Sequence, residues 1–150
     1  MANSYSKLYI HYIFSTKHRK PTIEPKFMNR LWRYIAGTAR DTNMEPLAVG
    51  GISNHIHALI ILPPTLSVSD GIQILKGSSS KWINDHSFTK VTFRWQSGYG
   101  AFSVGYSQLD QTISYIRNQK SHHQHKTFKE EYLEILEYHQ IDYNPDYVLG

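Results

Sequence analysis

The sequence predicts an α+β protein with the ferredoxin-like, split βαβ fold: an antiparallel sheet with two helices on one face, plus C-terminal helices. Three observations lead to this prediction. Strand and helix patterns follow one another in the order βαββαβ, and further helix patterns come after them. The length of 150 residues fits one compact domain, and no repeat or linker divides it. A hydrophobic content of 40% with 19% charged residues is an ordinary globular balance.

The first half of the chain contains three predicted strands and one helix. Residues 8–15 alternate in polarity and are rich in Tyr and Ile, which predicts a strand. Residues 25–40 place apolar side chains at helical spacing, which predicts a helix. Residues 46–51 and 56–62 are predicted to be two strands joined by a tight turn that contains glycine.

The second half contains three predicted helices and a broken strand. Residues 67–85, 107–119 and 127–138 have helical apolar spacing, whereas residues 91–95 and 101–104 are predicted strand segments. Hydroxyl side chains are predicted to cap the three helices at their first turns: Ser67 or Ser69, Ser107, and Thr127.

Charge is unevenly distributed along the chain. Residues 1–126 contain 15 Lys and Arg against 6 Asp and Glu, a balance of +9. Residues 127–150 contain one Lys and 6 acidic residues, a balance of −5. A basic body with a short acidic tail indicates a polyanionic partner for the body, although a merely solvated basic surface is equally compatible with the charge alone.

Composition excludes several classes of site. The chain has no cysteine, so disulfides and thiolate metal sites are excluded. The longest apolar run, residues 58–62, is far too short to span a bilayer. The first residues lack the pattern of a signal peptide, and we expect a cytoplasmic protein with no membrane partner.

The strongest chemical signal is the pair His55 and His57 at the start of a predicted strand. Residues two apart on a strand point to the same face, so the two imidazoles lie side by side while Ile56 faces the core. Two neutral imidazoles at this spacing are able to bind one divalent metal ion. An ordinary pair of surface or cross-strand histidines has the same spacing, so the pattern alone does not decide.

A third ligand is expected from the helix at residues 107–120. Tyr115 and Gln119 are four residues apart and share one helix face, at roughly 6 Å between Cβ atoms. That face would place an amide oxygen on the metal with a phenol beside it. The alternative is that Tyr115 is a core aromatic, since the chain has 11 tyrosines and spacing does not select one.

Together these residues resemble the HUH superfamily, and more closely the single-tyrosine transposases of minimal bacterial insertion sequences, which include REP-associated tyrosine transposases. The resemblance runs from Tyr5 to about Tyr147, nearly the whole chain. It is carried, in order, by Leu8–His11 with Phe14–Lys17, Asn54–His57, Leu75–Ser80, Trp95–Tyr99, Ser103–Gly105 and Tyr115–Gln119.

The resemblance implies a role for each matched residue. The metal ligands would be His55, His57 and Gln119, the nucleophile would be Tyr115, and the ion would be Mg²⁺ or Mn²⁺. Asn54 stands where relatives often have Asp, and no ligand role is expected there. The whole chain, 1–150, would be a single HUH domain with residues 127–150 as a C-terminal extension.

The resemblance also implies an activity and partners. Such enzymes cleave and rejoin single-stranded DNA by transesterification through a 5′-phosphotyrosine, and they recognise hairpins at the ends of their element. They form homodimers in which the tyrosine helix can complete the histidine pair of the partner subunit. Here this would require a flexible joint near residues 105–107. A bacterial cytoplasmic location, at the nucleoid during action, is expected.

Basic side chains next to polar or aromatic residues are candidates for DNA contacts. A basic turn follows the first strand, and Lys76 and Lys81 flank a run of glycine and serines. Trp95 and Tyr99 offer surfaces on which bases could stack, unless they are core aromatics. The full set of predicted DNA contacts is Lys17, Arg19, Lys20, Lys76, Ser79, Lys81, Arg94, Arg117 and Lys120.

Other histidines and other functions are alternatives to this hypothesis. A zinc site formed by His122, His123 and His125 is less favoured than a polar helix end, and His11 is expected to be packed rather than catalytic. No dedicated base for Tyr115 is evident, although Lys120 or a metal-bound water would be near. The alternative functions are a non-catalytic single-stranded nucleic-acid-binding module and a domesticated relative that acts on chromosomal repeats.

Overall fold

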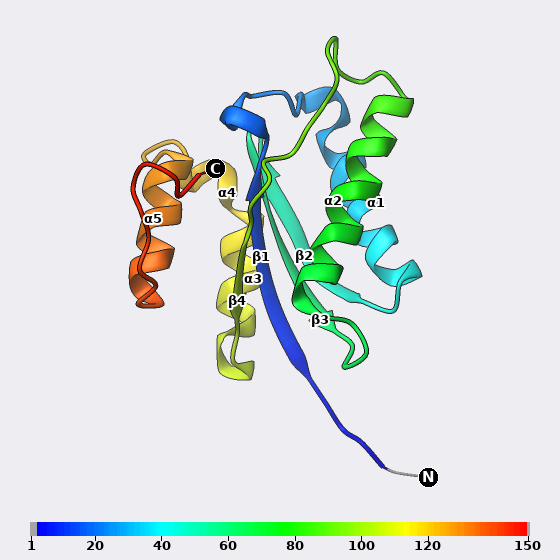
Figure 1. Cartoon of the computed structure of the whole chain (residues 1–150), viewed down its shortest axis with the longest axis vertical. Coiled ribbons are helices and arrows are strands. Elements are labelled where there is room, and N and C mark those ends of the chain that lie inside the picture. Colours follow the sequence, from blue (N-terminus) through cyan, green and yellow to red (C-terminus); the bar gives the residue numbers. More distant parts are fainter. Residues whose placement is uncertain (1–2, 150) are drawn as a thin grey trace.

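Four strands form one antiparallel sheet in the computed structural model, which describes residues 3–149 (Figure 1). The strands are β1 (Leu8–Ser15), β2 (Glu45–Ile52), β3 (His55–Leu62) and β4 (Gly100–Ser103). Their order across the sheet is β2-β3-β1-β4, and each neighbouring pair is antiparallel. The predicted ferredoxin-like arrangement is thereby confirmed.

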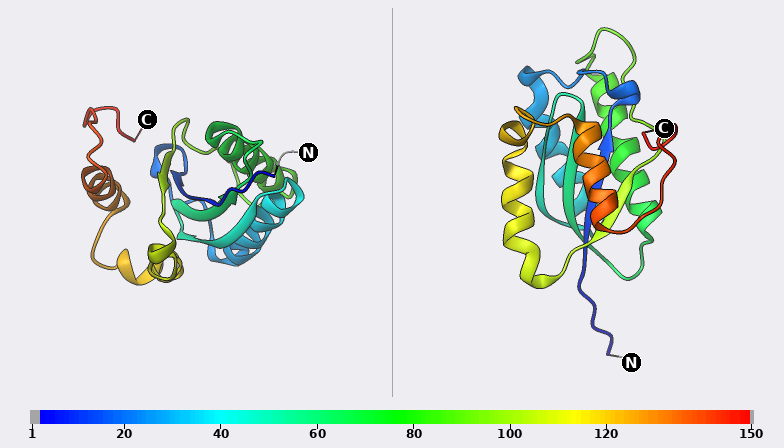
Figure 2. Two further views of the ribbon diagram at one scale, coloured as in Figure 1. Left: turned by 90° about the horizontal axis from the view of Figure 1, so that it is seen from below. Right: turned by 90° about the vertical axis from the view of Figure 1, so that its left-hand side faces the viewer.

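Helices cover both faces of the sheet (Figure 2). On one face lie α1 (Pro25–Asp41) and α2 (Val68–Asp85). On the other lie α3 (Leu109–Arg117), α4 (Gln119–His122) and α5 (Phe128–Tyr138). Two short 3₁₀ turns, η1 (Lys17–Arg19) and η2 (Tyr106–Gln108), complete the elements. Within residues 3–149, no helix combines the length and apolarity needed to cross a membrane.

The core under α1 and α2 follows from the alternation of β1 and β3. Tyr12, Phe14, Ile56, Ala58 and Ile60 point to that face and are almost fully buried. α1 meets them with one apolar stripe, formed by Phe27, Leu31, Ile35 and Ala39. α2 begins where predicted, since the Ser67 side chain accepts a hydrogen bond from the Asp70 amide at 3.0 Å.

A glycine in β2 allows α3 to lie close to the opposite face of the sheet. A Cβ atom at Gly50 would lie 2.7 Å from the carbonyl oxygen of Ile116, in α3. Gly50 also pairs with His57 in the β2–β3 register. The absent side chain therefore lets α3 pass directly beside the histidine pair.

The predicted strand at residues 91–95 is wrong. Only an isolated bridge between Thr16 and Trp95 forms there. The reason is local: the side chain of Asn84 accepts from the Phe93 amide at 2.7 Å and donates to the Phe93 carbonyl at 3.1 Å. The backbone groups that a neighbouring strand would have satisfied are bonded to this amide instead.

The helix predicted at residues 107–119 is divided in the structure. η2 and α3 come first, and a break at Asn118, with φ −102° and ψ 24°, separates α3 from α4. Ser107 does not cap α3, whose N-cap position is Gln108 without a side-chain bond. The predicted cap of α5 is confirmed, because Thr127 and Glu130 form a capping box.

Candidate active site

The histidine pair lies on the face of β3 that α3, α4 and α5 cover. The side chains of His55 and His57 are fully buried, and Ile56 between them packs under α1 and α2. The shared face predicted for the two imidazoles is thus confirmed. Phe128 of α5 stacks on the His55 ring, with 4.5 Å between the centroids, and closes this side of the site.

The tyrosine helix brings its two predicted site residues to this pair within one chain. Gln119 Oε1 lies 2.8 Å from His55 Nε2, and the Tyr115 ring lies 5.6 Å from the His57 ring, centroid to centroid. The break at Asn118 does not separate them, because Gln119 Nε2 still contacts the Tyr115 carbonyl at 3.5 Å. A single chain therefore brings together all four residues.

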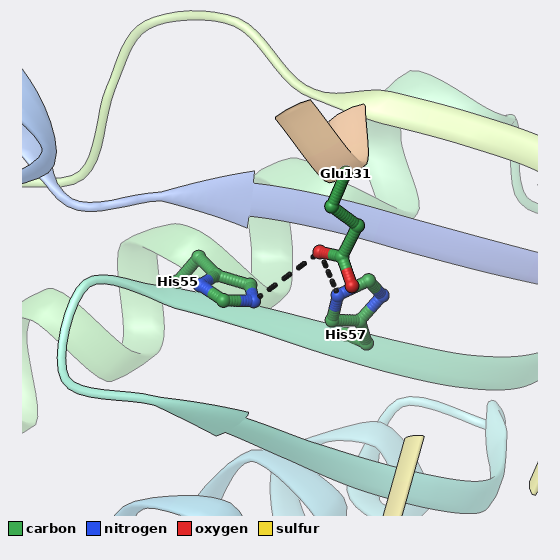
Figure 3. A group of neighbouring side chains, drawn as sticks. All are labelled: His55, His57 and Glu131. Atoms are coloured by element: carbon green, nitrogen blue, oxygen red, sulfur yellow. Dashed lines mark hydrogen bonds and ion pairs between the residues drawn. The ribbon is translucent and has the colours of Figure 1, made fainter. Parts of the chain in front are cut away.

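The structure adds Glu131 of α5 to the site (Figure 3). Its Oε1 atom lies 3.0 Å from His57 Nε2 and 3.5 Å from His55 Nε2. Its Oε2 atom accepts hydrogen bonds from the Tyr115 hydroxyl and, at 3.2 Å, from Gln119 Nε2. Only 3% of this residue is exposed, so it is a buried member of the cluster.

Sequence reasoning missed Glu131 because it treated residues 127–150 as an acidic extension. A signal was nevertheless present. Glu131 follows Phe128 by three residues and precedes Ile135 by four, so it lies on the apolar stripe of α5. A single carboxylate within such a stripe is expected to be buried and paired.

Two further side chains hold the imidazoles in position. Asn54 Oδ1 lies 2.8 Å from His55 Nδ1, and His11 Nε2 lies 2.8 Å from His57 Nδ1. Each contact leaves the Nε2 atom of the contacted histidine, His55 or His57, facing the centre of the site. His11 is buried, as predicted, but it is packed against the site rather than in a separate core.

The three later histidines do not form a metal site of their own. His123 belongs to the main cluster, where its Nε2 lies 3.1 Å from Gln119 Oε1 and 3.2 Å from Glu131 Oε1. The His122 ring lies 4.7 Å from that of Tyr115, and His125 is exposed. Among the residues described, the one group with suitable geometry is His55, His57 and Glu131.

The donor set of that group fits a divalent cation. Its three ligand atoms all lie within 4.8 Å of one another. Because Asn54 Oδ1 is an acceptor, we assign the proton of neutral His55 to Nδ1, so that Nε2 presents a lone pair to Gln119 Oε1, which is also an acceptor. Two facing acceptors cannot form a hydrogen bond with each other, but both can bind a cation placed between them. The Glu131 carboxylate would offset part of the charge of that cation.

Burial and hydrogen bonds shift the pKa values of His55, Glu131 and Tyr115. Burial, reinforced by His57, lowers the pKa of His55 to about 3, which keeps that imidazole neutral. Burial by itself raises the pKa of Glu131, but hydrogen bonds with His123, His57 and Tyr115 bring it below its ordinary value. Burial and the neighbouring Glu131 carboxylate raise the pKa of Tyr115. The cluster thus contains an ionised carboxylate beside a protonated phenol.

Several predicted DNA contacts line one basic hollow beside α2. Its volume is about 1010 Å³, and its walls include η1, the segment from Phe93 to Ser97, and the start of α5. Four of the predicted contacts line it: Lys17, Arg19, Lys76 and Arg94. Tyr99, which is 37% exposed, also lines it, whereas Trp95 is mostly buried against Phe14 and Phe93.

The other predicted contacts are dispersed. Lys20, Lys81, Arg117 and Lys120 are exposed outside the hollow, and Lys81 pairs with Asp85 at 2.5 Å. Ser79 is fully buried; its hydroxyl donates to the Leu75 carbonyl and accepts from the Trp95 indole. The prediction that Ser79 contacts phosphate is therefore wrong for this structure, since a helix-packing role uses its hydroxyl.

Lys76 has a structural role as well as a place in the hollow. Its ammonium group donates to the carbonyl oxygens of Gln96 at 2.6 Å and Gly98 at 3.0 Å. These bonds tie α2 to the segment before β4. Partial burial lowers the pKa of Lys76.

Comparison with known proteins identifies a family and two related folds. The family model described as "Transposase IS200 like" matches residues 4–119, a range that contains Tyr115 and Gln119 but ends before Glu131. A candidate transposase from Deinococcus radiodurans R1 is similar, with 22% identity and a TM-score of 0.65 over 79% of this chain and 95% of that one. A REP-associated tyrosine transposase bound to a REP hairpin is similar with 17% identity and a TM-score of 0.60, over 82% and 73%. No curated protein matches the chain.

Proposed function

This chain belongs to the IS200-like transposase family, and on that premise we propose that it cleaves and rejoins single-stranded DNA with Tyr115 as the nucleophile. The observation that carries the proposal is the convergence of the half-buried Tyr115 phenol with four buried potential ligands. A protein that only binds nucleic acid has no use for such a cluster beneath its surface.

The proposed metal ligands are His55 and His57, with oxygen atoms of Gln119 and Glu131 completing the set. When bound, a divalent ion such as Mg²⁺ or Mn²⁺ polarises the scissile phosphate and stabilises the charge that develops in the transition state. The neutral imidazole of His55 and the hydrogen bonds that direct Nε2 of both histidines prepare these ligands for the ion.

Tyr115 performs the covalent step in this proposal. Its phenol oxygen forms a bond to phosphorus while the bond to the 3′ oxygen breaks, which leaves a 5′-phosphotyrosine and a free 3′-OH. A phenol with an ordinary pKa of about 10 is a moderate leaving group. A 3′-OH can therefore attack the phosphotyrosine and rejoin the strands without a nucleotide energy source.

The basic hollow is the proposed path for the DNA backbone. Lys17, Arg19 and Arg94 supply positive charge there, and Tyr99 supplies a partly exposed ring for a base. One structural relative is bound to a REP hairpin, and we extend hairpin recognition at element ends to this chain. Action at the bacterial nucleoid follows from the same proposal.

A homodimer is part of the proposal, with active sites formed either within each chain or between the two subunits. The contacts of Tyr115 and Gln119 with the histidine pair of their own chain support the first arrangement. Mixing His55→Ala chains with Tyr115→Phe chains tests exchange between subunits. If tyrosine helices exchange, one composite site in the mixed dimer keeps both groups and activity returns; with sites formed within each chain, the mixture stays inactive.

The central test is a covalent adduct. The protein is incubated with labelled single-stranded DNA from the ends of its own element and Mg²⁺, then separated under denaturing conditions. We expect a protein–DNA adduct that Tyr115→Phe abolishes and that Tyr5→Phe, which removes a hydroxyl from a side chain 92% exposed, leaves unchanged. An adduct that persists in Tyr115→Phe would exclude this residue as the nucleophile.

A further inference from the structure

Glu131 occupies a position that the family match does not reach and that no metal-ligand role fully explains. Its two carboxylate oxygens have different partners. Oε1 faces the imidazoles of His55 and His57, where the metal would be held. Oε2 faces away from that pair and accepts the hydrogen bond of the Tyr115 hydroxyl.

From this geometry we infer that Glu131 is the catalytic base that takes the proton of Tyr115 as the phenol oxygen attacks the scissile phosphate. The inference rests on the proposed function of Tyr115 and adds a residue to it. The sequence predicts Lys120 or a metal-bound water as nearby groups, and the inference assigns the proton to Glu131 instead. Lys120 is exposed on α4. Within residues 3–149, the acceptor to which the Tyr115 hydroxyl donates is Glu131.

The helix that carries Glu131 is held firmly against the sheet. Phe128, Tyr132 and Leu136 of α5 pack with Ile13 of β1 and Phe102 of β4 in one apolar cluster. The capping box at Thr127 fixes the first turn of the helix, directly before Glu131. The buried carboxylate is therefore positioned by packing, as a preorganised base requires.

A hydrogen bond from Gln119 to the same carboxylate oxygen, Oε2, supports the role of Glu131 as a base. Gln119 Nε2 donates to Glu131 Oε2 at 3.2 Å, which orients the carboxylate plane between the metal side and the phenol side. Because the Tyr115 hydroxyl donates directly to Glu131 Oε2, its proton already points at the acceptor. The proton leaves while the new bond to phosphorus forms.

The step balances without any further reactant. The phenol O–H bond breaks and its proton moves to Oε2 of Glu131, while the O–P bond forms and the P–O3′ bond breaks. Glu131 then gives this proton, through solvent, to the departing 3′ oxygen, which becomes the 3′-OH while Glu131 returns to the carboxylate. In the rejoining direction protonated Glu131 supplies the proton to the leaving phenolate, as microscopic reversibility requires.

The test compares Glu131→Gln with the wild type and with Glu134→Gln. Gln has nearly the same shape but cannot accept the proton, whereas Glu134 is an exposed carboxylate one turn further along α5. Calorimetry with Mn²⁺ first gives the affinity of each variant, so that adduct rates are compared with every variant saturated. We expect Glu131→Gln to form the adduct about 100-fold more slowly and Glu134→Gln to match the wild type.

A rescue experiment separates a lost base from a disturbed site. 3,5-Difluorotyrosine at position 115 is a more acidic phenol and depends less on a base. In the Glu131→Gln background we expect it to recover at least about 10-fold of the lost rate. A disturbed site gives no such recovery, and absence of rescue would overturn the inference.

The remaining outcomes are equally decisive. If Glu131→Gln matches or exceeds the wild-type rate at saturating Mn²⁺, Glu131 is not the base, although Tyr115 can still be the nucleophile. If the wild type forms no adduct that Tyr115→Phe abolishes, the proposed function itself fails and this inference fails with it. The Tyr115→Phe control thus distinguishes the two failures.

Discussion

The two faces of the sheet differ more than any other two regions of this protein. Under α1 and α2, alternate residues of β1 and β3 form an apolar core around Tyr12, Phe14 and Ile56. On the opposite face, the residues between them place His11, His55 and His57 beneath α3 and α5. Neighbouring positions of one strand therefore face the apolar core and the candidate site in turn, because strand side chains alternate between faces.

The comparison predicts that changes on the two faces have separable effects. A substitution on the α1/α2 face should lower the free energy of unfolding and leave the folded protein active. A substitution on the α3/α5 face should impair metal binding or adduct formation more than folding. Adjacent residues of β3 offer the sharpest contrast.

The largest effect is expected for His57→Ala. Loss of one of two neighbouring imidazole ligands should lower adduct formation by about 10³-fold and weaken Mn²⁺ binding strongly. Denaturing gels and calorimetry measure the two effects, and circular dichroism checks that the variant still folds. If the His57→Ala variant were active, the α3/α5 face of the sheet would not carry the site that forms the adduct. Chelation of the metal in the wild-type protein should reproduce the loss.

The next largest effect is expected for the adjacent residue, on the other face. Ile56→Ala opens a cavity in a fully buried position and should lower the free energy of unfolding by about 3 kcal/mol. Urea unfolding measures this change. At a temperature where the variant is folded, its adduct rate should stay within about two-fold of the wild type. A rate loss comparable to that of His57→Ala would show that the two faces are coupled.

A smaller effect is expected for His11, which lies on the functional face but would touch no metal. His11→Ala removes the contact at His57 Nδ1, and Mn²⁺ affinity should fall about 10- to 100-fold. His11→Gln offers an amide oxygen to the same nitrogen and should recover part of the affinity. His86→Ala, at an exposed histidine after α2, is the matched control and should bind Mn²⁺ as the wild type does.

The smallest effect is expected where the backbone of the sheet meets α3. Gly50→Ala would press on the Ile116 carbonyl, shift the tyrosine helix and lower the adduct rate about 10-fold, at a stability cost of about 1 kcal/mol. Gly37→Ala in α1 meets nothing within 4 Å and should be neutral or slightly stabilising. Equal behaviour of the two variants would contradict the close approach of α3.

Local patterns were sufficient for much of the scaffold. The alternation in residues 8–15 and 56–62, the apolar stripe of α1 and the Ser67 cap each depend on residues a few positions apart. For the same reason the shared face of His55 and His57 was predictable from a spacing of two. The roles of Tyr115 and Gln119 came from resemblance to a family rather than from spacing.

Local patterns failed where distant segments decide the outcome. Residues 91–95 have the composition of a strand, but the N–H and C=O groups of Phe93 form hydrogen bonds with the side chain of Asn84 instead of with a neighbouring strand. Ser79 lies in a polar run that suggested phosphate contact, yet the Trp95 indole, 16 positions later, uses its hydroxyl in the core. Both errors arise because a hydrogen-bond partner cannot be read from the neighbours in sequence.

By itself, the sequence determined the order of the elements, the faces of the strands and the pair of imidazoles, since these follow from periods of two and 3.6 residues. Only the tertiary structure decided that Glu131, 74 positions after His57, lies against that pair and holds the Tyr115 hydroxyl. The physical reason is that α5 docks through Phe128, Tyr132 and Leu136. Docking by apolar contacts depends on the assembled surface of the sheet, which no local pattern contains.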